Sequence, residues 1–196
     1  MEKGSMVLEE DSTREEFVEA MEELGLELVE EQESEGETVP YVSNWNSPDG
    51  KVQVQYIEEP RLGVNFVLFQ ASNLAHFARV LGEKLFWYGV DELYERAEYA
   101  TTHNEGVKAI FRLTAGICTA NNLPPRAKHI YLEYLAQEHW MTRRAAVQAV
   151  AYGRWPESVE ILEHIVTQDP DERVRDFASL QLSNVKKDLV ERGISI

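Results

Sequence analysis

Apolar residues recur along the chain with two different spacings, and the change between them divides the sequence into two parts. In residues 6–71 apolar positions alternate with polar ones over several short runs, a pattern that predicts strands with one buried face. In residues 72–196 they recur every three to four positions, which predicts helices. We therefore expect an α+β protein, with an N-terminal helix and a small antiparallel sheet followed by an all-α region of helical hairpins.

The first element is predicted to be an amphipathic helix over residues 13–24. Ser12 and Glu15 have the S-x-x-E spacing of a capping box. Residues three or four positions apart give this helix an apolar face, formed by Phe17, Met21, Leu24 and Leu28. Residues 1–5 are expected to be the remnant of an expression tag before a native start at Met6.

A small sheet is predicted after this helix. Its strands are expected at residues 26–29, 41–45, 51–56 and 64–69. The acidic stretch 30–37 is predicted to be a loose connection. The segment Ser47-Pro48-Asp49-Gly50 predicts a turn, because proline presets one backbone dihedral and glycine accepts a positive φ. We expect an antiparallel meander packed on the first helix.

The helical region is predicted to contain several helices joined by short connections. Two begin near Ser72 and Asp91, and five more are expected over residues 107–118, 126–138, 142–152, 156–167 and 171–191. Prolines 125, 156 and 170 each lie near a predicted helix start, where a missing N–H costs little. Helices of this length and spacing indicate hairpins that stack on one another.

One sequence pattern occurs twice in this region. Residues 169–178 have the form D-P-x-x-x-V-R-x-x-A. An echo lies 32 residues upstream, where Arg143 stands in the place of Arg175 and Ala146 in the place of Ala178. A repeat of this length is typical of stacked helical hairpins, which build extended binding surfaces.

With this pattern, residues 140–185 resemble HEAT-like repeats, the group that includes bilin lyase subunits and many scaffolding proteins. The resemblance implies an arginine–aspartate ladder between repeats, to which Arg175 and Asp169 belong and in which Arg143 is the counterpart of Arg175. A third copy at the same spacing would place Thr114 where the small residue of the pattern should stand. The resemblance specifies a fold and no reaction.

Acidic residues are concentrated near the N-terminus. Residues 9–37 contain fourteen acidic side chains and one basic one, a balance of −13 within a formal net charge of −16. Such a segment attracts basic partners, although a solvated helix face followed by an acidic loop has the same composition, so both interpretations stay open. Residues 124–196 hold ten basic and eleven acidic side chains without a basic stripe, so no nucleic-acid partner is expected.

Residues that commonly carry catalysis or bind metals are sparse. Cys118 is the only cysteine, and its place on a predicted helix favours a buried apolar role over that of a nucleophile. Two pairs share a predicted helix face, His129 with Glu133 and Glu160 with His164, and each is half a metal site at most. G-x-S-x-G and Walker A patterns are absent. We expect no enzyme activity, no metal and no cofactor.

The composition also bears on location. No apolar run approaches the ~20 residues of a membrane span, so no membrane partner is expected. No basic segment followed by an apolar one indicates a secretory signal. A single cysteine suits a reducing compartment. We expect a cytoplasmic protein.

Large aromatic residues are the strongest candidates for short-range adhesion to a partner. The run Phe86-Trp87-Tyr88 is too wide for one helix face, and Trp140 and Trp155 lie near the ends of successive predicted helices. Such residues are favoured both as interface anchors and as core residues. We expect at least one of Trp87, Tyr88, Trp140 and Trp155 to be exposed on a binding face.

These observations favour a non-catalytic protein-binding module. Within that class we favour an acidic inhibitor or immunity-type protein that blocks a basic partner. The alternatives are a HEAT-like scaffold or adaptor and a lyase-like accessory factor. The partner surface is expected to combine the acidic side chains of the first helix with the aromatics, as the set Glu15, Glu16, Glu19, Glu22, Glu23, Trp87, Tyr88, Trp140 and Trp155.

Overall fold

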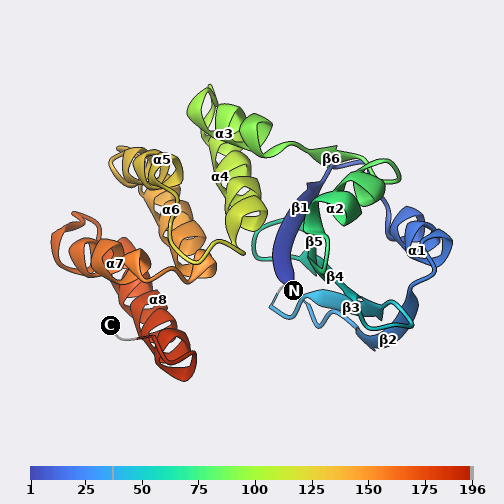
Figure 1. Ribbon diagram of the computed structural model, residues 1–196. Helices are drawn as coiled ribbons and strands as arrows, with labels where there is room; N and C mark the ends of the chain where they lie inside the picture. Colours follow the sequence, from blue (N-terminus) through green and yellow to red (C-terminus); the bar gives the residue numbers. More distant parts are fainter. Residues whose placement is uncertain (37, 195–196) are drawn as a thin grey trace. The chain divides into compact units, whose positions relative to one another are not determined.

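The protein has an α+β architecture (Figure 1). The computed structural model describes residues 1–36 and 38–194, over which the chain forms one six-stranded antiparallel sheet and eight helices. The chain divides into two compact units, Met1–Val90 and Asp91–Ile196, and the sheet belongs to the first. Both predicted element types, helices and an antiparallel sheet, are therefore present.

From the change of period we predicted a boundary near residue 71. The boundary between the two units lies later, between Val90 and Asp91. The helix α2 (Leu74–Gly82) contributes Phe77 and Leu81 to the core that covers the sheet. The short strand β6 (Trp87–Tyr88) pairs with the first strand of the same sheet. Helical periodicity therefore begins before the N-terminal unit ends.

The sheet has the strand order β2-β3-β4-β5-β1-β6. The predicted meander is present, because β3, β4 and β5 pair consecutively and antiparallel. Gly50, in the predicted turn between β3 and β4, has a φ of 68°. The strand bounds are β1 Glu2–Leu8, β2 Glu27–Gln32, β3 Tyr41–Asn46, β4 Val52–Glu59 and β5 Val64–Ala71.

The strand β1 includes residues that we expected to be a tag remnant. It pairs with β5 from Glu2, opposite Ala71, to Val7, opposite Phe66. At Gly4 an added Cβ would lie 2.7 Å from the ring of Phe69, so a larger residue there would displace that ring. The first residues of the chain are thus an integral part of the sheet.

The first helix, α1 (Arg14–Glu23), begins one residue later than its sequence pattern predicted. Thr13 is the N-cap, and it forms a capping box with Glu16 in place of the predicted Ser12–Glu15 pair. Ser12 is buried, and its hydroxyl donates a hydrogen bond to the carbonyl oxygen of Phe86 at 3.1 Å. Ser12 and Thr13 are adjacent hydroxyl residues, so the capping-box pattern fits two helix starts that differ by one residue. Thr13 is the N-cap because the hydroxyl of Ser12 is engaged with Phe86.

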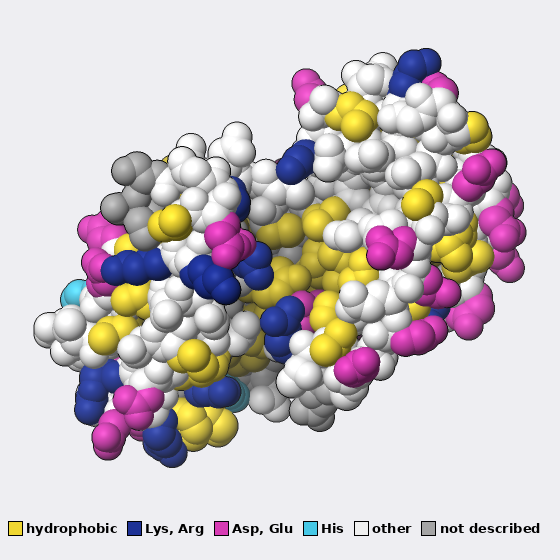
Figure 2. All heavy atoms as spheres, turned by 90° about the horizontal axis from the view of Figure 1, so that it is seen from below, with side chains coloured by type: hydrophobic (Ala, Val, Ile, Leu, Met, Phe, Trp, Pro, Cys, Tyr) yellow, Lys and Arg dark blue, Asp and Glu magenta, His cyan; other side chains and the backbone are white. Residues whose placement is uncertain are grey.

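The strand β2 extends into the acidic stretch that we predicted to be a loop. Residues 27–32 are all exposed, and all but Val29 are paired with β3. Glu37 of the same stretch lies outside the described residues. Acidic side chains gather along the right-hand margin of Figure 2, on the side where Figure 1 shows α1 and β2. An edge strand tolerates such a sequence because water solvates both of its faces.

The helices α1 and α2 pack on one face of the sheet and close the core of the N-terminal unit. Phe17 of α1 stacks on Tyr56 with ring centroids 4.6 Å apart. Its edge also meets Trp45, at a centroid distance of 6.2 Å. Phe17, Met21 and Leu24 of the predicted apolar stripe therefore face the sheet, whereas Leu28 was wrongly included, because it lies in the exposed strand β2.

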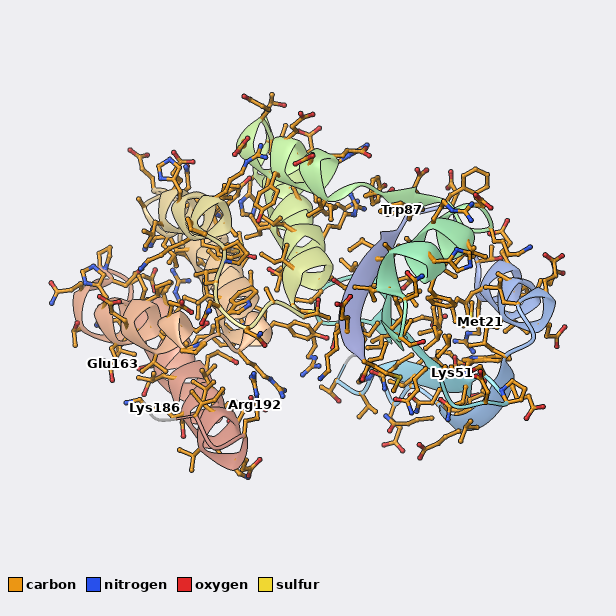
Figure 3. The ribbon with its side chains drawn as sticks, in the orientation of Figure 1. Met21, Lys51, Trp87, Glu163, Lys186 and Arg192 are labelled. Carbon is orange, nitrogen blue, oxygen red and sulfur yellow. The ribbon has the colours of Figure 1, made fainter. Side chains whose placement is uncertain are left out.

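The C-terminal unit consists of helices arranged in two rows (Figure 1). The helices α4, α6 and α8 pack successively on one another, while α5 and α7 pack on this row. An ion pair of 2.7 Å between Glu163 and Lys186 joins α7 to α8 (Figure 3). The bounds are α3 Val90–Glu98, α4 His103–Ile117, α5 Pro125–Leu135, α6 Trp140–Gly153, α7 Glu157–Gln168 and α8 Glu172–Glu191.

The spacing between equivalent helices differs along this unit. The starts of α6 and α8 are 32 residues apart, as the sequence echo predicted, whereas those of α4 and α6 are 37 residues apart. Counted from the helix starts, Ala109 of α4 has the position of Ala146 of α6, and both alanines are buried. Thr114 shares a hydrogen bond of 2.8 Å with the hydroxyl of Tyr131.

Candidate protein-binding site

A buried ion pair connects the helices of the C-terminal unit. Arg143 of α6 donates two hydrogen bonds to the carboxylate of Asp169, with Nε–Oδ2 at 2.7 Å and Nη2–Oδ1 at 3.0 Å. Its remaining terminal nitrogen donates to the carbonyl oxygens of Gln137 and Glu138. Hydrogen bonding to the Asp169 carboxylate raises the pKa of Arg143 above its usual value. The pair holds the loop before α6 against the loop before α8.

Arg175 occupies the equivalent position on α8 and makes a smaller set of contacts. It donates a hydrogen bond of 2.8 Å to the carbonyl oxygen of Asp169, six residues before it. Arg143 has the same relation to the carbonyl oxygen of Gln137. The side chain of Asp169 meets Arg143 and also accepts from the backbone N–H of Asp171 at 2.9 Å. Of the three predicted ladder residues, Arg143 and Asp169 form an ion pair through their side chains. Arg175 contacts Asp169 through the backbone carbonyl oxygen of Asp169 and not through its carboxylate.

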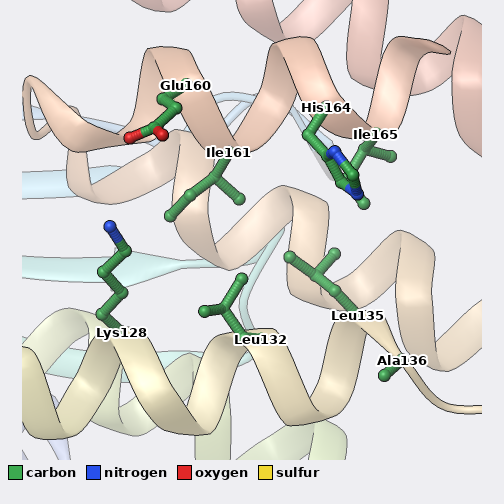
Figure 4. Close-up of a pocket in the computed structure, with 8 residues that line it drawn as sticks. All are labelled: Lys128, Leu132, Leu135, Ala136, Glu160, Ile161, His164 and Ile165. Carbon is green, nitrogen blue, oxygen red and sulfur yellow. The ribbon is translucent and has the colours of Figure 1, made fainter. Parts of the chain in front are cut away.

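An apolar groove lies between α5 and α7 (Figure 4). Its volume is about 520 Å³. Leu135, Ile161 and Ile165 are buried and form the floor, while Leu132 is 45 % exposed on one wall. Lys128 and Glu160 lie on opposite sides of one end (Figure 4). The groove thus has an aliphatic floor and charged rims, a combination typical of ligand and peptide sites.

A second hollow of about 440 Å³ continues the first toward the loops. The two share Leu135, Ala136, His164 and Ile165 in their walls. Arg143 and Asp169 line the second hollow, and each is already bonded to the other. The ion pair therefore forms part of the wall at this end of the groove, and its two charged groups are already hydrogen-bonded to each other.

Sequence reasoning did not find this groove. The buried residues of α5 include Ala127, Ile130, Tyr131 and Leu135, which pack inside the unit. Leu132 lies beside that set and carries its side chain toward water. An extra leucine next to a buried stripe was the only signal in the sequence, and the separation of α5 from α7 is a tertiary property.

The four aromatics predicted for the partner surface have different environments. Trp155 is 1 % exposed and Tyr88 is 8 % exposed, so both are core residues and the prediction for them is wrong. Trp87 is 38 % exposed and lies against Gly82. Trp140 is half-buried beneath the guanidinium of Arg173, whose central carbon lies 3.7 Å from the ring centroid. Only Trp87 and Trp140 retain surface that a partner could contact.

The five glutamates predicted on α1 are all exposed. Glu16 accepts a hydrogen bond from the backbone N–H of Thr13, and Glu23 pairs with Lys84 at 2.5 Å. Trp87 belongs to the same unit as these side chains, whereas Trp140 and Trp155 belong to the other. The predicted set is therefore divided between two units.

The candidates for catalysis and metal binding have structural contacts. Burial raises the pKa of the Cys118 thiol to about 12, which keeps it protonated at neutral pH. The thiol donates to the carbonyl oxygen of Ala115 at 3.2 Å. His129 pairs with Glu133 at 3.2 Å on the surface of α5. None of these contacts supplies an activated nucleophile.

The chain matches no known protein family model, no curated protein and no solved structure. Within residues 1–36 and 38–194, no group of three histidine, cysteine or acidic side chains is placed to hold a metal ion. In the same part of the chain no helix is both long and apolar enough to cross a bilayer. The groove between α5 and α7 is a concave surface of the described residues with an aliphatic floor.

Proposed function

We propose that the protein is a non-catalytic protein-binding module whose C-terminal unit holds an apolar helix of its partner in the groove between α5 and α7. The observation that carries the proposal is the exposed leucine, Leu132, above a floor of buried aliphatic side chains. A volume of about 520 Å³ lies within the roughly 300–1,000 Å³ of known binding pockets. Covering Leu132 and the floor would remove apolar surface from water.

A helix suits this groove better than a compact ligand. The two hollows join end to end, so the apolar surface is elongated along the helices. Its walls come from residues three or four positions apart on α5 and α7, and such walls accept the apolar stripe of an added helix. Lys128 and Glu160 at opposite rims would fix the direction in which the partner helix lies.

In this proposal the C-terminal unit acts as a HEAT-like scaffold or adaptor. The two rows of helices, the repeated arginine and the buried Arg143–Asp169 pair support it. Stacked hairpins characteristically present an elongated surface to other proteins. The lyase-like accessory role stays a prediction, because no observation in the described residues favours it.

Replacing Leu132 by glutamate is expected to weaken the binding of a helical peptide by about tenfold or more, because it puts a charge on the apolar wall. The probe is a 15-residue helical peptide with an apolar stripe, selected from a displayed library on the natural protein. Binding is measured by fluorescence anisotropy.

The matched control is Leu180→Glu, since Leu180 is 59 % exposed on α8 and outside the groove. Its binding is expected to stay within about twofold of the natural protein, and both variants should keep their melting temperature because surface changes are usually within ~0.5 kcal/mol. Peptides that bind the two variants equally would contradict the groove as the site.

A second function, the capture of a basic partner, is supported by the charge of the N-terminal unit. Residues 1–90 carry nineteen acidic and six basic side chains, a balance of −13. Five exposed glutamates line α1. A field of this sign speeds association with a basic protein and weakens as salt is added. This is the acidic inhibitor or immunity-type role, and it uses a different unit from the groove.

A further inference from the structure

The edge of the sheet at β2 is open to a further strand. In the described strand order β2 is the terminal strand and is hydrogen-bonded to β3 alone. All six of its residues are exposed, including the apolar Leu28 and Val29. A terminal strand presents unpaired N–H and C=O groups, which an extended segment of another protein can use.

A bulge in β2 places two of its three carboxylates, Glu27 and Glu30, on the same face. Glu27 pairs opposite Asn46 and Glu30 opposite Asn44, with the register shifted between Leu28 and Glu30. Asn46 and Asn44 are two residues apart on β3, so Glu27 and Glu30 lie on the same face despite being three apart in sequence. In a regular strand, residues three apart point to opposite faces, so the bulge at Val29 is what brings the two carboxylates to one face.

These two carboxylates have the spacing of alternate residues in a strand, about 7 Å. A segment added beside β2 would bring every second side chain into register with Glu27 and Glu30. Lysine or arginine at those positions would meet opposite charge. A second copy of this edge would instead bring glutamates against glutamates, which is destabilising. The two carboxylates therefore disfavour pairing of identical chains and favour a basic strand.

We propose that β2 accepts an extended basic segment of a partner protein as a seventh strand, with its lysine or arginine side chains at alternate positions facing Glu27 and Glu30. The proposal rests on the second function above, the capture of a basic partner, and names the element that makes the contact. The five glutamates of α1 then supply the long-range attraction, while β2 supplies the main-chain hydrogen bonds and the register.

The first test uses an acetylated, fluorescent seven-residue peptide in which lysine alternates with valine, measured by anisotropy in low salt. The reversal Glu27→Lys with Glu30→Lys is expected to weaken binding by about tenfold or more, because it turns two attractions into repulsions. The matched reversal on α1, Glu15→Lys with Glu19→Lys, changes charge equally and is expected to cost less than about threefold. Equal losses in both variants would overturn the proposal, because the binding would then depend on overall charge and not on β2.

The second test separates strand addition from charge alone without changing the protein. One peptide is N-methylated at its odd residues and another at its even residues, so each loses the N–H groups on one edge. Binding should be lost with one peptide and retained with the other. Equal binding of both methylated peptides, or equal binding of a peptide with its lysines in one block, would overturn the edge proposal and leave the capture of basic partners standing.

Two further outcomes would also overturn the proposal. Absence of binding by the alternating peptide to the natural protein would remove the edge site. Dimers of the natural protein, detected by analytical ultracentrifugation, that no longer bind the alternating peptide would assign the edge to a second copy of the chain.

Discussion

Replacing Asp169 by alanine is expected to lower the free energy of unfolding by about 3–5 kcal/mol, because Arg143 would stay buried without its counter-charge. Both side chains are almost closed to water, and the two hydrogen bonds between them measure 2.7 and 3.0 Å. The loss includes the tie between two loops, since Arg143 also binds the carbonyl oxygens of Gln137 and Glu138. Urea denaturation followed by circular dichroism measures the change.

The chain offers a matched control for this variant. Arg126 and Glu98 form a bidentate pair of the same kind, with both hydrogen bonds at 2.8 Å, but the pair lies at the surface. Glu98→Ala should therefore cost about 1 kcal/mol or less. A double change, Arg143→Met with Asp169→Leu, should recover much of the loss because no charge stays buried. Equal losses for Asp169→Ala and Glu98→Ala would contradict the structural role of the buried pair.

Replacing Trp155 by alanine is expected to cost about 3–5 kcal/mol of stability, as large aromatic truncations in cores do. Its ring is completely enclosed, lies 6.1 Å from that of Tyr131 between centroids, and rests against Gly153. An added Cβ at Gly153 would come within 2.0 Å of the Trp155 ring, so only glycine leaves room for it. Thermal and urea unfolding of the variant measure the effect.

Two other changes identify the cause of the loss at Trp155. In the described part of the chain the indole N–H has no hydrogen-bond partner, so Trp155→Phe should cost clearly less than the alanine variant. Trp140→Ala, at a half-buried ring stacked by Arg173, should cost about 1 kcal/mol through the lost cation–π contact and packing. A larger loss at Trp140 than at Trp155 would reverse the assignment of core and surface.

The period of apolar residues predicted the elements because it follows from which face is buried. The meander and the helices after residue 100 needed only this local signal. The period of apolar residues did not predict the strand β1. Gly4 and Ser5 resemble part of a tag, and the pairing of β1 with β5 is a long-range contact that no local pattern indicates. The strand predicted at residues 26–29 matches the first half of β2, whereas its acidic continuation to Gln32 was predicted to be a loop, because an edge strand needs no buried face and no alternation marks it.

The candidate surfaces were harder to predict than the elements. Trp140 and Trp155 both follow a polar residue near a helix end, and nothing local distinguishes the core residue from the exposed one. The groove depends on how far α5 stands from α7, which the residues of either helix alone do not encode. The resemblance placed Arg143, Asp169 and Arg175 in one ladder, but it did not specify that Asp169 pairs with Arg143, because that pairing is a tertiary contact.

The two proposed surfaces predict different partners. An apolar helix in the α5–α7 groove would be held by the burial of leucine and isoleucine, and its affinity should change little with salt. A basic strand on β2 would be held partly by charge, and its affinity should fall steeply as salt rises. Salt titration of a captured partner therefore assigns it to one unit or the other.

Photo-crosslinking from within the groove tests the proposed function most directly. A photoreactive benzoyl-phenylalanine replaces Leu132 in one variant and Leu180 in another, and crosslinked partners are identified by mass spectrometry in the native host. We predict that position 132 captures an apolar helical segment of a specific protein and that position 180 does not. Capture of the same protein from both positions, or from neither while that protein still co-purifies, would contradict a partner helix in the groove.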